Sequence, residues 1–315
     1  MLKKYRLVLI TISILILLAI VWFANPQLLF SYLLKSDIRF VLLGLLASGL
    51  ALVIRVLKWY VLLDNVKFTE LMPVQLLGIA ISNMTPGKVA EPAKAVLLKL
   101  RTNKDVSKTL PSVIWERLLD IIILVSFALF GIQLFGLKAN FYSLSVFAVG
   151  AFVLLIAMLL VVLFIKRVGI FVFNTLRRLP LLSRVSEDFV HAFYEKKVRK
   201  RRLVICFPIT VLPWILDGLV LYFAGLAVGI EITPFVAIGV ITLSVLIGIA
   251  SSLPGGLGSA EAVSILLLGL VGISSAPAAA VVFLARFLSF WFSILIGGLS
   301  FIYLSKKIDM KALKF

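Results

Sequence analysis

The sequence predicts an all-α integral membrane protein with six transmembrane helices and two re-entrant helical hairpins in inverted-topology repeats. Of its 315 residues, 62% are hydrophobic and the mean hydropathy is +1.17, whereas soluble domains contain about 45–50% apolar residues. Apolar stretches of ~18–25 residues, the length that crosses about 30 Å of hydrocarbon, recur along the whole chain. Two further apolar segments are interrupted by Pro-Gly clusters that match each other.

The predicted spans account for most of the chain. In order, they are residues 7–24, 40–63, 111–135, 142–165, 203–228 and 277–304. The first follows a basic N-terminus as a signal peptide would, but its apolar core is too long and no small-residue cleavage site follows it. We therefore interpret it as a transmembrane helix within a single membrane domain, residues 1–315.

Lysine and arginine are concentrated in alternate loops, and this sets the predicted orientation. The termini, the 64–110 region and above all the basic 166–202 loop carry them. Because cytoplasmic loops collect Lys and Arg, we expect all of these on the cytoplasmic side of the cell membrane. The net charge of +18 thus reflects topology and not nucleic-acid binding. The basic loop is either a solvated connector or a binder of anionic lipid.

The two interrupted segments, 72–100 and 234–272, are predicted to enter the membrane from opposite sides. The first break, Asn83-Met-Thr-Pro-Gly-Lys88, has basic flanks and enters from the cytoplasm; the second, Ser251-Ser-Leu-Pro-Gly-Gly-Leu-Gly258, lacks them and enters from outside. Non-helical backbone at membrane depth must be buried in protein or line a wet cavity, so we expect both breaks inside the bundle. In an alternative with eight spans, each interrupted segment crosses twice and the outer topology is unchanged.

An internal repeat accompanies the breaks. In each half, Pro-Gly is followed by a glutamate and then by an arginine in the next span, at offsets of 168 to 170 residues between the halves. We therefore predict that residues 40–135 and 203–304 are inverted-topology repeats. This architecture is typical of secondary transporters, whose substrate site lies near the midplane where broken helices meet.

Charged residues within apolar segments are the candidate site. Each costs about 2.5–3.5 kcal/mol at the centre of a spanning helix, so such residues indicate function or a buried ion pair. With the polar residues and glycines of the breaks, the candidate substrate-binding residues are Arg117, Arg286, Glu91, Glu261, Asn83, Lys88, Lys94, Glu116, Asp120, Asp217, Gly87, Gly255 and Gly256. Arg55 and Lys58 lie close to the inner end of their span and can extend to water, so we leave them out.

Arginines beside the backbone N–H groups of broken helices suit a phosphate or a carboxylate. Glu91 and Glu261 are expected to pair with the arginines when the site is empty, or to carry a coupling proton. The structural alternative is that these ion pairs only hold the hairpins in place. The one histidine, His191, lies in the basic loop and the one cysteine, Cys206, in an apolar run, so we expect no catalytic residues, no metal site and no cofactor.

Four motifs identify a family resemblance: Asn83…Pro86-Gly-Lys88…Glu91…Lys94, Glu116-Arg-Leu-Leu-Asp120, Leu253-Pro-Gly-Gly-Leu-Gly258…Glu261 and Arg286-Phe-Leu. They resemble the flippase-like membrane domain of lysylphosphatidylglycerol synthases, which has free-standing relatives in bacteria and archaea. The resemblance covers roughly residues 7–304. In the synthases this domain is fused to a soluble transferase domain and is taken to move the modified lipid between leaflets.

The resemblance implies a lipid translocase (flippase) for a phospholipid, an aminoacyl-lipid or a polyprenyl-phosphate-linked lipid. We expect membrane lipids with an anionic or phosphate-bearing head group as partners and no nucleic acid. The sequence leaves the lipid, the energy source, the direction of movement and formation of a homo-oligomer open. The alternatives are a membrane-embedded lipid-modifying transferase, which requires an activated donor, and an accessory partner of such an enzyme.

Overall fold

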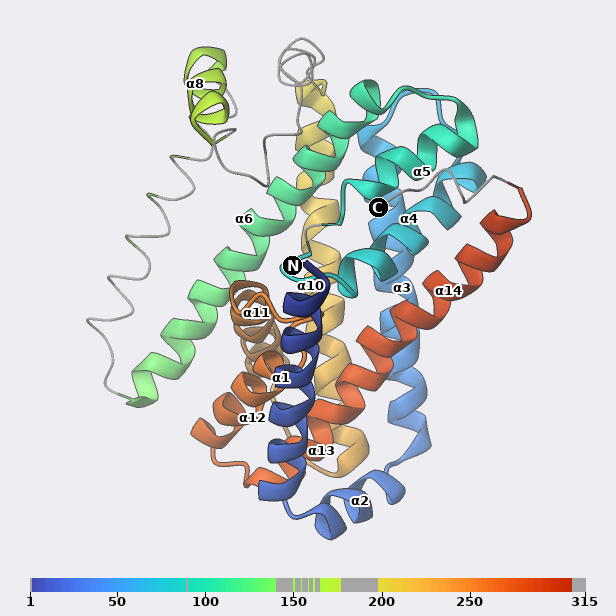
Figure 1. The fold of residues 1–315 in the computed structure, drawn as a ribbon. Coiled ribbons are helices and arrows are strands. Elements are labelled where there is room, and N and C mark those ends of the chain that lie inside the picture. Colours follow the sequence, from blue (N-terminus) through green and yellow to red (C-terminus); the bar gives the residue numbers. More distant parts are fainter. Residues whose placement is uncertain are drawn as a thin grey trace.

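Helices make up the regular structure of the part of the chain that the computed structural model describes, which is residues 2–88, 90–139, 165–176 and 198–307 with the single positions 150, 154, 158 and 161. In chain order they are α1 (Leu2–Phe23), α2 (Pro26–Leu34), α3 (Ile38–Leu62), α4 (Phe68–Asn83), α5 (Ala93–Thr102), α6 (Val106–Ala139), α8 (Lys166–Leu176), α10 (Lys200–Val228), α11 (Pro234–Ala250), α12 (Ser259–Leu270), α13 (Ser275–Arg286), the π-helical turn η1 (Phe287–Trp291) and α14 (Phe292–Ser305). Figure 1 shows their arrangement. The predicted all-α membrane fold is confirmed.

Four predicted spans coincide with helices long and apolar enough to cross a membrane. They are α3, the Val106–Phe135 part of α6, α10, and the continuous helix Ser275–Ser305 formed by α13, η1 and α14. A fifth results if α1 and α2 are counted as one bent span. The predicted span 142–165 is described only at positions 150, 154, 158, 161 and 165, and residues 177–197 of the basic loop, with His191, fall outside the described residues. The number of six spans therefore stays a prediction.

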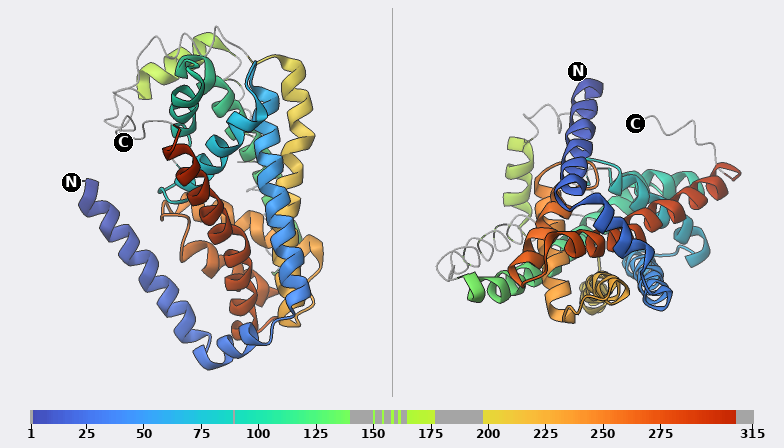
Figure 2. Two further views of the ribbon diagram at one scale, coloured as in Figure 1. Left: turned by 90° about the vertical axis from the view of Figure 1, so that its right-hand side faces the viewer. Right: turned by 90° about the horizontal axis from the view of Figure 1, so that it is seen from below.

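The chain turns sharply between α1 and α2 because of Asn25 and Pro26. Asn25 has a φ of 60° and accepts a hydrogen bond from the N–H of Leu28, which caps α2, while Pro26 occupies the first turn. The two helices meet at 86°. Figure 2 shows α1 leaning away from the bundle and α2 lying at its end, next to the start of α3.

Both Pro-Gly clusters interrupt their segments as predicted, leaving the helix pairs α4/α5 and α11/α12. Figure 1 shows α4 and α5 in the upper half of the molecule and α11 and α12 in the lower half. The breaks meet between them, since Pro86 and Pro254 pair in an isolated antiparallel bridge. A Cβ on Gly255 would lie 2.9 Å from the carbonyl oxygen of Asn83, so the second break is in direct contact with the end of α4.

Glycines allow the helices around the breaks to approach closely. A Cβ on Gly218 of α10 would lie 2.4 Å from the side chain of Ile238 in α11, and one on Gly297 of α14 would lie 2.2 Å from Ala80 in α4. Small residues at crossings are the usual way to gain van der Waals contact between membrane helices. Each hairpin is therefore held against a long helix by backbone proximity.

Candidate functional site

A cavity of about 150 Å³ lies at the centre of the bundle, beside the first break. Its walls come from α3, α4, α6, α10, α11, α13, η1 and α14 and from the first break, so both halves of the chain contribute. Most of its polar lining is charged: Arg55, Lys88, Glu91, Glu116, Arg117, Asp120, Asp217 and Arg286. A smaller adjoining cavity lies directly between the breaks and shares Asn83, Lys88 and Arg286 with the larger one.

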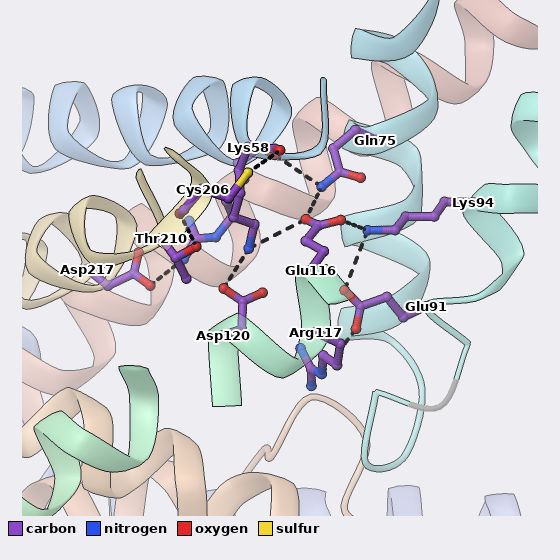
Figure 3. Close-up of polar contacts among 11 residues, drawn as sticks. Lys58, Gln75, Glu91, Lys94, Glu116, Arg117, Asp120, Cys206, Thr210 and Asp217 are labelled. Carbon is purple, nitrogen blue, oxygen red and sulfur yellow. Dashed lines mark hydrogen bonds and ion pairs between the residues drawn. The ribbon is translucent and has the colours of Figure 1, made fainter. Parts of the chain in front are cut away.

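Glu116 on α6 is the centre of a buried network in the first half (Figure 3). Its carboxylate lies 2.5 Å from the ammonium of Lys94 on α5 and 3.5 Å from that of Lys58 on α3. Gln75 on α4 donates to the same carboxylate at 2.9 Å. The side chains of Glu116, Lys94 and Lys58 are at most 2% exposed. The network therefore ties α3, α4, α5 and α6 together.

Further ion pairs extend this network toward the cavity on both sides. Arg117 lies 3.2 Å from Glu91 in the first break, and Glu91 also lies 3.7 Å from Lys94. On the other side, Lys58 contacts Asp120 at 2.6 Å. Charges of alternating sign thus run from the first break across α5 and α6 to α3. In this low-dielectric surrounding, each charged side chain is held in place by its neighbours of opposite charge.

The interpretation of Arg55 and Lys58 as residues that extend to water was wrong. Lys58 is 0% exposed, and Arg55 lines the cavity and contacts Asp217 of α10 at 2.6 Å. Arg55 and Lys58 are three residues apart and share one face of α3, which turns toward α6 and α10. That spacing, together with Asp120 and Asp217 in later spans, is a signal that favours including them, although it does not by itself exclude that they extend to water.

In the second half, Arg286 makes three contacts that hold it beside the cavity. Its Nε lies 2.5 Å from Glu261, its Nη2 donates to the carbonyl of Gly255 at 2.8 Å, and its guanidinium lies 4.4 Å from the ring centre of Phe290. Glu261, 1% exposed, also accepts from the N–H of Gly258 at 2.7 Å and so caps α12. The π turn η1 follows Arg286 directly, and such turns are frequent at functional sites.

The remaining predicted residues lie in the breaks. Asn83 ends α4 and donates to the hydroxyl of Ser293 at 3.0 Å. Gly87, Gly255 and Gly256 have φ values of 58°, 63° and 63°, a conformation that glycine adopts at little cost. Lys88 lines both cavities, has a φ of 58°, and in the described part of the chain its ammonium makes no hydrogen bond or ion pair.

Among the described residues, three buried polar atoms beside the cavity lack hydrogen-bond partners. They are the indole N–H of Trp214 on α10, 7% exposed, the side-chain oxygen of Gln75, 1% exposed, and one carboxylate oxygen of Glu91, which lies 3.2 Å from Arg117 in an ion pair. An unmet hydrogen bond on a buried group costs free energy, so such atoms are suited to a ligand or water in the cavity. Sequence reasoning missed Trp214 and Gln75, because neither carries a charge that marks it within an apolar segment.

The predicted site residues are therefore brought together. All of them line the two cavities or pair with residues that do. Among the described residues, no group of His, Cys, Asp and Glu has the arrangement to hold a metal ion. The fold and site define a multi-pass α-helical membrane protein with a charged central cavity between two interrupted hairpins.

Within that class, the chain belongs to the family of the lysylphosphatidylglycerol synthase transmembrane region, whose model matches residues 10–297. It is 29% identical to a UPF0104 membrane protein of Pyrococcus horikoshii, with 94% of this chain and 96% of the relative covered. It is 26% identical to a UPF0104 membrane protein of Methanothermobacter thermautotrophicus, covering 98% of both. A UPF0104 membrane protein of Methanocaldococcus jannaschii is 23% identical, covering 96% of both. The predicted family is confirmed.

Proposed function

We propose that this protein is a lipid translocase that moves a lipid with an anionic, phosphate-bearing head group between the leaflets. The observation that carries the proposal is the charged central cavity, which is lined from both halves of the chain and adjoins the meeting point of the two breaks. Intramembrane ionisable residues are expensive to bury and mark pathways or binding sites. A cavity between interrupted helices is the usual place for a transported substrate.

In this proposal the head group enters the cavity and the acyl or prenyl chains stay in the bilayer. Arg117 and Arg286 supply positive charge to the cavity, and backbone N–H groups of the breaks add donors. Glu91 and Glu261 occupy the arginines when the cavity is empty. A phosphate that takes the place of a carboxylate at an arginine keeps the charge of that arginine compensated.

We further infer the membrane arrangement from the sequence. Six spans place both termini, the 64–110 region and the 166–202 loop in the cytoplasm of a cell-membrane protein, and residues 40–135 and 203–304 are inverted repeats. The positions of α4/α5 and α11/α12 at opposite ends of the bundle support this arrangement (Figure 1). Scanning cysteine accessibility in a Cys206→Ala background tests it: cysteines in 166–202 that label from the outside of intact cells would overturn the orientation.

A scrambling assay tests the transport proposal. Purified protein in proteoliposomes is compared with Arg117→Ala and Arg286→Ala for fluorescent phospholipids, aminoacyl-lipids and polyprenyl phosphates. Transport of one lipid class, lost in both variants, is expected. Arg39→Ala is the matched control, because Arg39 is exposed and lies outside the cavity. No transport of any lipid by folded protein, or transport unaffected by loss of both arginines, would refute the proposal.

A further inference from the structure

The charge balance of the cavity points to the class of lipid that it takes. Resting on the transport function proposed above, we propose that the cavity accepts head groups with a net negative charge, that it excludes cationic aminoacyl head groups, and that Lys88 is the residue that makes this selection. The family's name would suggest the opposite class of head group. Three features of the described residues support the proposal.

The first feature is that every carboxylate around the cavity already has a cation. The five carboxylates and their partners form the pairs Asp217–Arg55, Asp120–Lys58, Glu116–Lys94, Glu91–Arg117 and Glu261–Arg286. Among the described residues of the cavity and its pairs, Lys88 is the cation that remains. The cavity therefore carries one uncompensated positive charge when empty. A head group with one net negative charge restores neutrality, and a cationic one adds a like charge in a low-dielectric site.

The second feature is the backbone of Lys88. The turns Pro86-Gly87-Lys88 and Pro254-Gly255-Gly256 correspond in the two repeats, and the third residue has a φ of 58° in one and 63° in the other. The left-handed conformation is unfavourable for a residue with a Cβ, and the second turn meets it with glycine. Lysine stands in the first turn despite this cost. Residues kept in such strained conformations cluster at ligand-binding sites.

The third feature is the set of hydrogen-bond donors near Lys88. The charged groups that act on its ammonium are those of Arg117, Glu91, Arg55 and Asp217. In the described part of the chain, Arg117 has one carboxylate contact, at 3.2 Å, and its side chain is 25% exposed. The Trp214 indole N–H that lines the same cavity has no acceptor among the described residues. Lys88, Arg117 and Trp214 can thus all donate to phosphate oxygens, which accept but do not donate when ionised.

Arg286 is held more tightly than Arg117. Its Nε contacts Glu261, its Nη2 donates to the Gly255 carbonyl and its guanidinium lies over the Phe290 ring. Arg286 therefore contributes positive charge at the second break, whereas Lys88, beside Arg117 at the first break, sets the preference for an anion.

The experiment uses the intact protein in proteoliposomes with two lipids that share one fluorescent acyl chain: phosphatidylglycerol, which is anionic, and lysylphosphatidylglycerol, which is cationic. We expect wild-type protein to transport the anionic lipid at least about tenfold faster, the equivalent of about 1.4 kcal/mol. Transport of lysylphosphatidylglycerol at an equal or higher rate would overturn the inference while leaving the transport function intact. Transport of neither lipid nor of any other lipid class would instead refute the transport function itself.

Variants at position 88 test the assigned residue. Lys88→Asn removes the charge but tolerates the left-handed backbone, and we expect it to reduce transport of the anionic lipid about tenfold, the loss of one charge-assisted hydrogen bond. Lys88→Gly removes the charge and also relieves the strain, so it should unfold at a higher temperature than wild type while losing transport. Lys88→Glu should reverse the preference between the two lipids.

The matched control is Lys99→Asn, which removes the same charge from an exposed position of α5 outside the cavity. It should leave both rates and their ratio unchanged. An unchanged lipid ratio in Lys88→Asn or Lys88→Glu would overturn the role of Lys88. A lower unfolding temperature for Lys88→Gly would show that the lysine stabilises the fold, which also contradicts the proposal.

Discussion

Replacing Glu116 by glutamine should destabilise the protein by about 3 kcal/mol. Removing one member of a buried ion pair costs about 3–5 kcal/mol, because the other charge is left without compensation. Glu116 is 2% exposed and forms ion pairs with two buried ammonium groups, that of Lys94 at 2.5 Å and that of Lys58 at 3.5 Å. The loss lies at the lower end of the range because Lys94 keeps Glu91 at 3.7 Å and Lys58 keeps Asp120 at 2.6 Å.

The lone cysteine supplies the assay for this prediction. Cys206 is 0% exposed and is the only cysteine in the chain, so a thiol-reactive fluorophore should label the protein only as it unfolds. Unfolding in mixed micelles, followed by this labelling, compares wild type with Glu116→Gln. The control is Lys108→Gln, which breaks an ion pair with Asp105 whose side chains are 50% and 55% exposed; exposed pairs contribute about 0–1 kcal/mol.

A double-mutant cycle isolates the cause. Lys94→Met removes the ammonium that loses its nearest carboxylate in Glu116→Gln, so the double variant should be more stable than the sum of the single losses by about 1–3 kcal/mol. If Glu116→Gln costs no more than Lys108→Gln, or if the cycle shows no coupling, the reasoning about the buried network is refuted.

Two further predictions concern glycines where helices or turns approach closely. Gly255→Ala should destabilise the folded protein by about 2 kcal/mol or more, since its φ is 63° and the new Cβ would lie 2.5 Å from the ring of Phe290. The control Gly298→Ala, which has open space around it, should leave the stability unchanged in the same unfolding assay. Gly297→Leu should separate α14 from α4, because a Cβ there already lies 2.2 Å from Ala80; the measurement is the midpoint of Cys206 labelling, and a midpoint equal to that of Gly298→Ala would contradict this packing.

Much of the fold was predictable because membrane solvation acts on local sequence. A span must be apolar over its whole length, and a Pro-Gly pair interrupts it regardless of its neighbours. Hence α3, α6, α10 and the helix ending in α14 begin and end near the predicted residues. The bend between α1 and α2 was not predicted, since its angle depends on what α2 packs against.

The candidate site was only partly predictable. Charged residues stand out in apolar segments, so Glu91, Arg117, Glu261 and Arg286 could be identified and even paired by repeat. Lys58 could not be placed in this way, because the sequence allows a lysine near the end of a span either to reach water or to turn inward. Lys58 turns inward because Asp120 and Glu116, which lie on a different helix, contact its ammonium.

The sequence by itself determined that the chain is surrounded by lipid, which segments are helical and where the helices break. These properties follow from hydrophobicity and backbone conformation within short stretches of chain. Only the tertiary structure decided which cation pairs with which carboxylate. Pairing is a matter of a few ångströms between helices that lie far apart in the sequence, and electrostatic energy in a low-dielectric interior changes steeply over that distance. For the same reason, Lys88 could be recognised as the cation without a carboxylate partner among the described cavity residues only once the other pairs were in place.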